Sequence, residues 1–240
     1  MRTRQQAAEA AEPAGAAARP GLRERKKQRT RDALLHAALE LFTTQGYEQT
    51  TVDEIAAAVD VSQRTFFRYF ANKEETTFAV QDMVESHFVA AVRERPAHEA
   101  PLNALRRALL DSWDTLGEVI EEVIPVELHM RTYQLIESTP TLLAAHLRRS
   151  SELEEEIARV IAEREGLDVD TDPRPRVVVA AFSGVMRLTG RLWGAGEDTS
   201  IESMRRVTES YLDQIGPALA EDWNRRGRGA ERDGSGVHAL

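Results

Sequence analysis

The chain has 240 residues, 42% of them hydrophobic, which is enough for a packed core in one or two domains. It contains no cysteine, so a disulfide framework, a thiol nucleophile and a cysteine-based zinc site are excluded. The longest apolar run, near residues 177–185, contains Ser183 and Gly184 and is shorter than the roughly 18 residues of a membrane-spanning helix. Because the N-terminus also lacks an apolar signal-peptide core, we predict a cytoplasmic protein with no membrane partner.

The net charge of −9 is unevenly distributed. Residues 1–31 hold nine Arg or Lys and three Glu, a balance of +6, so the rest of the chain carries −15. Six of these cations lie close together: Arg23, Arg25, Lys26, Lys27, Arg29 and Arg31. Such a cluster favours phosphate binding when a DNA-binding motif adjoins it. Without such a motif, a solubilising basic tail would be the better interpretation.

The N-terminal part begins with residues 1–22, which have no periodic apolar face and are predicted to be a disordered arm. From Arg23 to Gln45 the spacing predicts a helix, with Leu34, Leu35, Ala38, Leu41 and Phe42 on one face. Gly46 is typical of the residue that ends a helix. Tyr47 is expected to pack beneath the next helix.

Residues 51–69 predict two short helices joined by a tight turn. The first has apolar residues at i, i+3, i+4 and i+7, namely Val52, Ile55, Ala56 and Val59. Thr51 and Glu54 have the spacing of a capping box, and Ser62 suits the N-cap of the second helix. The turn at residues 59–61 has the length found in a helix-turn-helix. Phe66 and Phe70 are expected to face inward.

Further along the chain, Asn72 is expected to cap a long helix over residues 73–95, which Pro96 ends. After a linker at 96–101 we predict helices at 101–118, 119–137 (kinked or split by Pro125), 140–165, 175–194 and 201–224. Residues 165–174 form an acidic loop, and residues 225–240 a disordered tail. The fold class is therefore all-α. The predicted domains are a helix-turn-helix domain at 23–75 and a larger helical domain at 76–224.

The helix-turn-helix region resembles the TetR family of bacterial transcription regulators. The resemblance rests on residues 33–42, Gly46-Tyr47, residues 50–52, Ile55-Ala56, Val61-Ser62 and Thr65-Phe66, and on Tyr69-Phe70 and Lys73-Glu74. It implies a homodimer that binds operator DNA through three N-terminal helices and senses a small molecule through its C-terminal domain. This chain departs from the family pattern at Asp60, where Gly is usual, at Arg64 and at Phe67. Asp tolerates the left-handed backbone region, so the turn is expected to be kept.

The second helix of such a motif lies in the major groove. Arg and Gln can each bond two groups of a base edge, so Gln63, Arg64 and Thr65 are predicted to contact bases. Phosphate contacts are predicted for Thr51, Ser62, Arg68, Tyr69 and Lys73, with Phe67 on the same face but lacking a tyrosine hydroxyl. Two alternatives stay open: Tyr69 packs in the core, or Arg68 pairs with a carboxylate.

An effector pocket is expected among the long helix and the C-terminal bundle. Aromatic and Met side chains suit a large apolar ligand, and the candidates are Phe78, Met83, His87, Phe88, Trp113, His129, Met130, Tyr133, Phe182 and Met186. Taken singly, each of them is more often ordinary core than a ligand contact. The motif also looks like an actinobacterial branch that senses acyl-CoA-like or fatty-acid-like ligands. By resemblance, the helices at 175–194 and 201–224 form the dimer interface; a monomeric core is the alternative.

The predicted function is that of a DNA-binding regulator, a repressor released from a palindromic operator by a small apolar ligand. One alternative is a constitutive DNA-binding dimer without a ligand. An all-α enzyme is a further alternative, which the sequence disfavours. The sequence has no His-Glu-x-x-His, Gly-x-Ser-x-Gly, phosphate-loop or dinucleotide motif. No cofactor or metal is therefore expected. The acidic run at residues 152–156 is interpreted as a solvated helix face.

Overall fold

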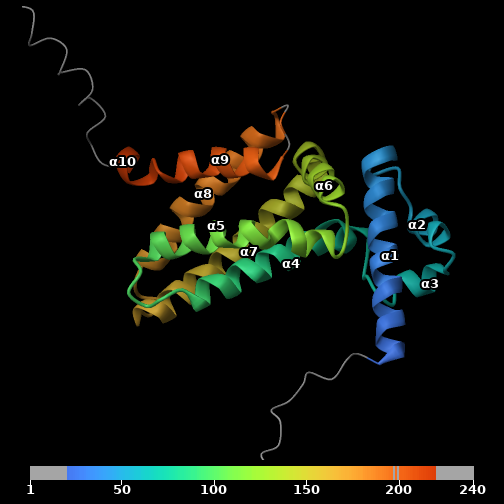
Figure 1. Cartoon of the computed structure of the whole chain (residues 1–240), viewed down its shortest axis with the longest axis horizontal. Helices are drawn as coiled ribbons and strands as arrows, with labels where there is room; N and C mark the ends of the chain where they lie inside the picture. Colours follow the sequence, from blue (N-terminus) through green and yellow to red (C-terminus); the bar gives the residue numbers. More distant parts are fainter. Residues whose placement is uncertain (1–20, 197, 199, 220–240) are drawn as a thin grey trace, which may run out of the picture.

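The computed structural model describes residues 21–196, 198 and 200–219, and every regular element in these ranges is a helix (Figure 1). The helices are α1 (Leu22–Gln45), α2 (Val52–Ala58), α3 (Gln63–Phe66), α4 (Lys73–Glu94), α5 (Pro101–Glu121), α6 (Val126–Ser138), α7 (Pro140–Glu165), α8 (Arg174–Gly194), α9 (Ile201–Leu212) and α10 (Ile215–Leu219). The all-α prediction is confirmed. Of the disordered arm predicted at 1–22, residues 1–20 lie outside the described residues, whereas Leu22 already belongs to α1, which begins one residue earlier than predicted. The predicted disorder at 225–240 and the predicted helix at 220–224 also lie outside the described residues.

The helices form a small N-terminal unit and a larger bundle. Figure 1 shows α2 and α3 on the side of α1 that faces away from the bundle. α4 runs without a break from the N-terminal unit into the bundle, so the predicted division after residue 75 falls inside its first turn. In the bundle α4 packs against α5 and α7, and α8 packs against α7 and α9. α6 packs on α1 as well as on α7, and therefore joins the two units.

α1 is amphipathic only in its second half. Leu34, Leu35, Ala38, Leu39 and Phe42 are buried, whereas residues 22–29 are exposed on all sides. The basic residues thus lie on a helix that begins at Leu22 and extends beyond the core. α1 ends at Gly46, whose φ of 98° favours glycine, and the ring of Tyr47 packs edge-on against that of Phe42 at 5.1 Å.

Several predicted helix boundaries differ from the structure, and two of the differences lie at a proline. α5 continues to Glu121 instead of ending at 118, and α6 begins at Val126, so Pro125 splits the helix predicted at 119–137, which was one of the two predicted outcomes. The N–H of Val126 donates to the Glu121 carboxylate at 3.0 Å, which closes this turn. The predicted helix at 201–224 is interrupted at residues 213–214. Pro217 has no N–H to bond the carbonyl of Asp213, and its ring would clash there in a continuous helix.

Within the described ranges, no helix is both long and apolar enough to cross a bilayer. α8 is the most apolar in sequence, and one of its faces packs inward through Val179, Phe182 and Trp193. Its other face is only partly covered in the single chain, where the side chain of Val177 is 64% exposed. This uncovered apolar face of α8 is a candidate surface for contact with another chain.

Candidate DNA-binding surface and effector cavity

The start of α2 is fixed by a complete capping box. The hydroxyl oxygen of Thr51 accepts from the N–H of Glu54 at 3.2 Å, and the Glu54 carboxylate accepts from the N–H of Thr51 at 2.8 Å. The Thr51 hydroxyl also donates to that carboxylate at 2.9 Å. These bonds lower the pKa of Glu54. A threonine hydroxyl has one proton to donate, and in Thr51 that proton bonds the Glu54 carboxylate. Thr51 could therefore donate to a phosphate, as predicted, only if its bond to Glu54 broke.

The second helix of the motif is anchored to the core by aromatic side chains. Phe66 and Phe70 are buried, as predicted, with ring centroids 5.7 Å apart. The preceding turn is kept by Asp60 at a φ of 55°, which confirms that aspartate takes the left-handed conformation here. Ser62 caps α3 by accepting from the N–H of Thr65 at 3.2 Å, and the two hydroxyls lie 3.0 Å apart.

Gln63 and Arg64 are the side chains that this helix leaves available. Both are exposed, and neither has a side-chain hydrogen bond within the described part of the chain. Thr65 is half-buried, with its hydroxyl beside that of Ser62. Phe67 is 50% exposed. The structure therefore presents two long polar side chains and one aromatic ring at the position where a recognition helix meets base edges.

The flanking candidates are already engaged within the protein. The Arg68 guanidinium donates to the Tyr69 hydroxyl at 3.2 Å and lies 5.0 Å from the centroid of that ring, so in this structure it pairs with a tyrosine and not with a carboxylate. Tyr69 is half-buried against the core. The Lys73 ammonium donates to the carbonyls of Tyr47 and Thr50 at 2.8 and 3.2 Å. Two of its three N–H groups thus hold the loop before α2, and one is left for a phosphate.

The basic start of α1 lies on the same unit as the recognition helix. Arg23, Lys26 and Arg29 are exposed, and Lys27 pairs with Glu24 at 3.5 Å on the surface. Arg31 lies over the ring of Phe70 at 5.1 Å, which ties α1 to the end of the motif. Positive charge is therefore concentrated where the overall charge of the chain would otherwise oppose DNA binding.

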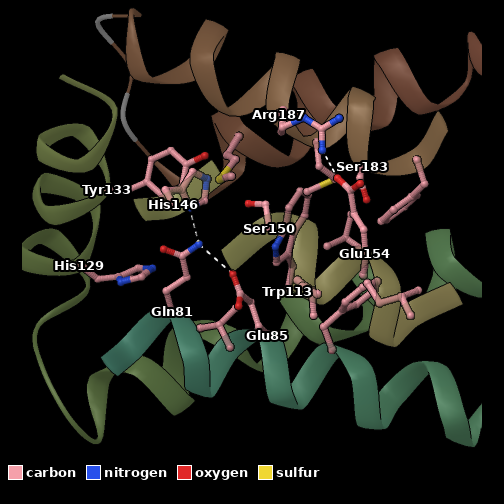
Figure 2. A pocket seen from close by; sticks show the side chains of 18 of the residues that line it. Gln81, Glu85, Trp113, His129, Tyr133, His146, Ser150, Glu154, Ser183 and Arg187 are labelled. Carbon is pink, nitrogen blue, oxygen red and sulfur yellow. Dashed lines mark hydrogen bonds and ion pairs between the residues drawn. The ribbon is translucent and has the colours of Figure 1, made fainter. Parts of the chain in front are cut away.

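The bundle encloses a cavity of about 210 Å³ between α4, α5, α6, α7, α8 and the start of α9 (Figure 2). By the same measure, the space needed to hold one water molecule is roughly 10–15 Å³, so the cavity can hold a larger molecule. Most of the lining is apolar. The structure brings seven of the ten predicted effector residues to this cavity: Phe88, Trp113, His129, Met130, Tyr133, Phe182 and Met186.

Phe78, Met83 and His87 do not line this cavity. On α4 its lining residues are 81, 84, 85 and 88, the i, i+3, i+4 and i+7 positions of one face. Residues 83 and 87 fall on other faces, and the His87 side chain is exposed. Phe78 shares the lining face but lies one turn nearer the DNA-binding unit, where it is fully buried and parallel to His146 with ring centroids 6.5 Å apart.

Sequence reasoning missed the polar lining residues. These are Gln81, Glu85, His146, Ser150, Glu154, Ser183 and Arg187. A signal was present, because Gln81 with Glu85, Ser150 with Glu154, and Ser183 with Arg187 are i, i+4 pairs on faces that are otherwise apolar. Polar pairs within apolar helix faces are therefore the pattern that marks this cavity.

One end of the cavity carries a hydrogen-bonded polar group. The Gln81 amide donates to Glu85 at 2.8 Å and lies 3.0 Å from Nδ1 of His146, as the dashed lines in Figure 2 show. Burial, with Arg149 and Arg187 nearby, lowers the pKa of His146, and burial raises the pKa of Glu85. Burial also lowers the pKa of His129 to about 4. Burial thus disfavours the charged form of all three side chains at this end.

The other polar group lies at the α7–α8 side, where Arg187 forms an ion pair with Glu154 (Figure 2). The two side chains are 37% and 25% exposed, so the pair lies at the edge of the cavity rather than deep inside. Ser150 and Ser183 line the cavity from the same two helices. The single Arg of the lining is thus already paired with a carboxylate.

The helices that line the cavity also contact the DNA-binding unit. α6 places His129, Met130 and Tyr133 at the cavity, and its Arg131 reaches Glu40 of α1 at 3.1 Å. The Thr141 hydroxyl, at the start of α7, donates to Glu48 at 2.9 Å. α4 begins at Lys73 in the DNA-binding unit and lines the cavity about two to four turns later. A change in cavity shape can therefore be passed to the DNA-binding unit through α4, α6 and the start of α7.

A capped helix-turn-helix with a basic neighbouring helix, set on an all-helical bundle with a ligand-sized cavity, defines a one-component transcription regulator. The chain belongs to the TetR family of bacterial regulatory proteins. Residues 34–80 match the family model described as bacterial regulatory proteins, tetR family, and residues 99–220 match the MftR C-terminal domain. It is a DNA-binding transcriptional regulator, and proteins of this family bind operator DNA as homodimers. The family is one of regulators and not of enzymes.

The chain is 48% identical over 208 residues to the HTH-type transcriptional regulator TcmR of Streptomyces glaucescens, covering 87% of this chain and 92% of TcmR. It is 28% identical over 177 residues to MftR of Mycobacterium tuberculosis, covering 74% of this chain and 86% of that one. NalD, the secondary repressor of the MexAB-OprM multidrug efflux pump in Pseudomonas aeruginosa, has the same fold. Its structure superposes with a TM-score of 0.55 at 17% identity, over 83% of this chain and all of NalD.

Proposed function

We propose that this regulator is a homodimeric repressor that leaves a palindromic operator when an apolar molecule occupies the bundle cavity. The observation that carries the proposal is the position of α6, which lines the cavity with His129, Met130 and Tyr133 and contacts α1 through Arg131. A ligand that prefers one shape of the cavity shifts the protein toward the arrangement of the two units that goes with that shape. The proposed site of action is the cytoplasm, where bacterial DNA lies.

The proposed DNA-binding domain is residues 23–75, and the proposed effector and dimer domain is residues 76–224. Within the first, Gln63 and Arg64 are proposed as the main base-reading side chains because they are exposed and unengaged. Thr65, half-buried, is proposed as a shorter-range contact. Phosphates are proposed to meet Ser62, Phe67, Arg68, Tyr69 and the third N–H of Lys73, with Thr51 contributing chiefly through its cap. Phosphate contacts fix the register of the protein on DNA, and base contacts provide specificity.

The proposed dimer interface is the outer face of α8 together with α9. Val177, Leu188 and Leu192 on α8 and Tyr211 on α9 are large apolar side chains that the single chain leaves between 36% and 64% exposed. Exposed apolar surface of this kind is stabilised by pairing with another surface. A second copy would cover it and set two recognition helices side by side, which favours a palindromic operator.

Two alternatives predict different behaviour. A constitutive DNA-binding dimer would have the same surface but would not respond to occupancy of the cavity, and an enzyme would convert the occupant. Two effector classes are also in question. The family resemblance suggests an acyl-CoA-like or fatty-acid-like molecule, whereas the mostly apolar lining, whose Arg187 is paired with Glu154, disfavours a charged ligand.

The test couples two measurements on the same purified protein. Duplexes selected from a random-sequence pool provide the operator, and a panel of apolar compounds is then screened for a rise in melting temperature, which reports binding to the folded protein. Compounds that raise the melting temperature are expected to weaken operator binding at least tenfold. If such compounds leave operator affinity unchanged, the regulator is constitutive and the proposal fails.

A further inference from the structure

The cavity holds information about its ligand that the fold alone does not. Its apolar wall combines aliphatic side chains with an aromatic and thioether part: the rings of Phe88 and Phe182 are parallel within 7° with centroids 5.9 Å apart, and Trp113, Met130 and Met186 lie in the same lining. Parallel rings and sulfur side chains favour a flat ligand body, because aromatic and thioether groups make favourable contacts with a π-face.

Charge decides between ligands of the same shape. Of the described residues that line the cavity, Arg187 is the only Lys or Arg, and it pairs with Glu154. His129 and His146 offer no positive charge in place of Arg187, because burial disfavours their protonated forms. An anion that enters must therefore displace Glu154 or leave its own charge unpaired in a mostly apolar space, and both are unfavourable.

A cationic ligand meets the opposite difficulty. The Glu85 carboxyl accepts a hydrogen bond from the Gln81 amide, and burial disfavours its charged form. Glu154 already has Arg187 as its partner. Each carboxyl group of the described lining is therefore already engaged, and a positive charge would have to compete with these partners. What the lining does offer is neutral hydrogen-bonding groups, among them the hydroxyls of Ser150 and Ser183 on facing helices.

We propose that the effector is a flat, uncharged aromatic molecule with hydroxyl or carbonyl groups, and that the Glu154–Arg187 pair makes the cavity reject anions. This inference rests on the proposed ligand-responsive function and specifies the ligand class of the same cavity. It separates this protein from a sensor of free fatty acids or of the phosphate-bearing head of an acyl-CoA. Glu154 acts as a selectivity residue by neutralising Arg187, the cation that an anionic ligand would otherwise use.

The test uses two probes of the same shape, 2-naphthol and 2-naphthoate, with isothermal titration calorimetry on the full chain without DNA. The wild type is expected to bind 2-naphthol at least about tenfold more tightly than 2-naphthoate. Glu154→Gln frees Arg187 and is expected to improve 2-naphthoate binding roughly fivefold, with little change for 2-naphthol. Glu152→Gln, which removes the same charge from an exposed position on α7, is expected to alter neither probe.

A double variant keeps the test decisive if the single change perturbs the fold. Glu154→Gln combined with Arg187→Met is expected to lose the gained 2-naphthoate binding while keeping that of 2-naphthol. The inference is overturned if 2-naphthoate or 2-naphthylmethylammonium binds the wild type as well as 2-naphthol, if 2-naphthol does not bind, or if Glu154→Gln leaves 2-naphthoate affinity unchanged. Because these titrations contain no DNA, 2-naphthol that binds without releasing DNA would refute the proposed function and leave this inference intact.

Discussion

The DNA-binding unit and the effector cavity are built from interactions of very different range. In the first, the starts of α2 and α3 are fixed by bonds between residues three apart, Thr51 with Glu54 and Ser62 with Thr65. In the cavity the decisive pairs are far apart in sequence: Gln81 contacts His146, and Arg187 contacts Glu154. The difference separates a locally fixed reading surface from a cavity whose shape depends on how whole helices pack. A ligand can therefore shift the helices around the cavity without unfolding the DNA-binding unit.

The largest expected effect comes from the aromatic support of the recognition helix. Phe66→Ala removes a fully buried ring that contacts Phe70, and we expect a loss of about 3–5 kcal/mol of unfolding free energy in denaturant titrations. The adjacent change Phe67→Ala, at a side chain that is 50% exposed, is the control and should alter stability by less than about 1 kcal/mol. Equal losses for the two variants would show that burial of the Phe66 ring does not anchor the recognition helix.

The next effect concerns base reading. Arg64→Ala should cost about 1–3 kcal/mol of discrimination at one or two operator positions, measured by competition between the selected operator and single-base variants. Arg159→Ala, which removes an exposed arginine from α7, should leave every base preference unchanged. A uniform loss across all operator variants would reassign Arg64 to a phosphate.

The capping box gives a smaller and pH-dependent effect. Thr51→Ala should lower the unfolding free energy by about 1 kcal/mol, whereas Thr51→Ser keeps the cap. Because the folded-state pKa of Glu54 is lowered, the stability it contributes is present above its ordinary pKa and is lost as the pH falls through the folded value. The difference in melting temperature between the wild type and Thr51→Ala should therefore be smaller at acidic pH than at neutral pH, because only the bond between the Thr51 hydroxyl and the carboxylate is lost on protonation. A constant difference across pH would contradict the coupling of Thr51 to Glu54.

The same contrast explains what could be predicted from sequence. Caps, the Asp60 turn and the buried Phe66 and Phe70 depend on residues within a few positions, so spacing sufficed. On α4, Phe88 was found but Met83 and His87 were misassigned, because apolar or aromatic character does not reveal which side of a helix meets a cavity. The Glu154–Arg187 pair could not be found, because it depends on how α7 and α8 cross. Pro217 was overlooked as the cause of the break between α9 and α10.

The smallest expected change in stability comes from the contact between the two units. The pair of Arg131 with Glu40 is half-exposed at 3.1 Å, so Arg131→Ala should change stability by less than about 1 kcal/mol. It should nevertheless reduce the ligand-induced change in operator affinity. Arg93→Ala is the matched control. It breaks an equally short, solvent-exposed ion pair with Glu156, which joins two helices of the bundle, α4 and α7, and does not involve the DNA-binding unit. If both variants respond to ligand as the wild type does, the α1–α6 contact is not the route of the signal.

The most direct test of the central claim, that occupancy of the cavity controls DNA binding, needs no ligand. Ser150 lines the cavity, and its neighbour Ser151 is exposed on the same helix. Ser150→Trp fills the cavity with an indole ring, whereas Ser151→Trp adds the same ring to the surface. Operator affinity is then measured by fluorescence anisotropy for both variants and the wild type. We predict that Ser150→Trp binds the operator at least about tenfold more weakly while Ser151→Trp matches the wild type; equal affinities for a folded Ser150→Trp and Ser151→Trp would contradict the account.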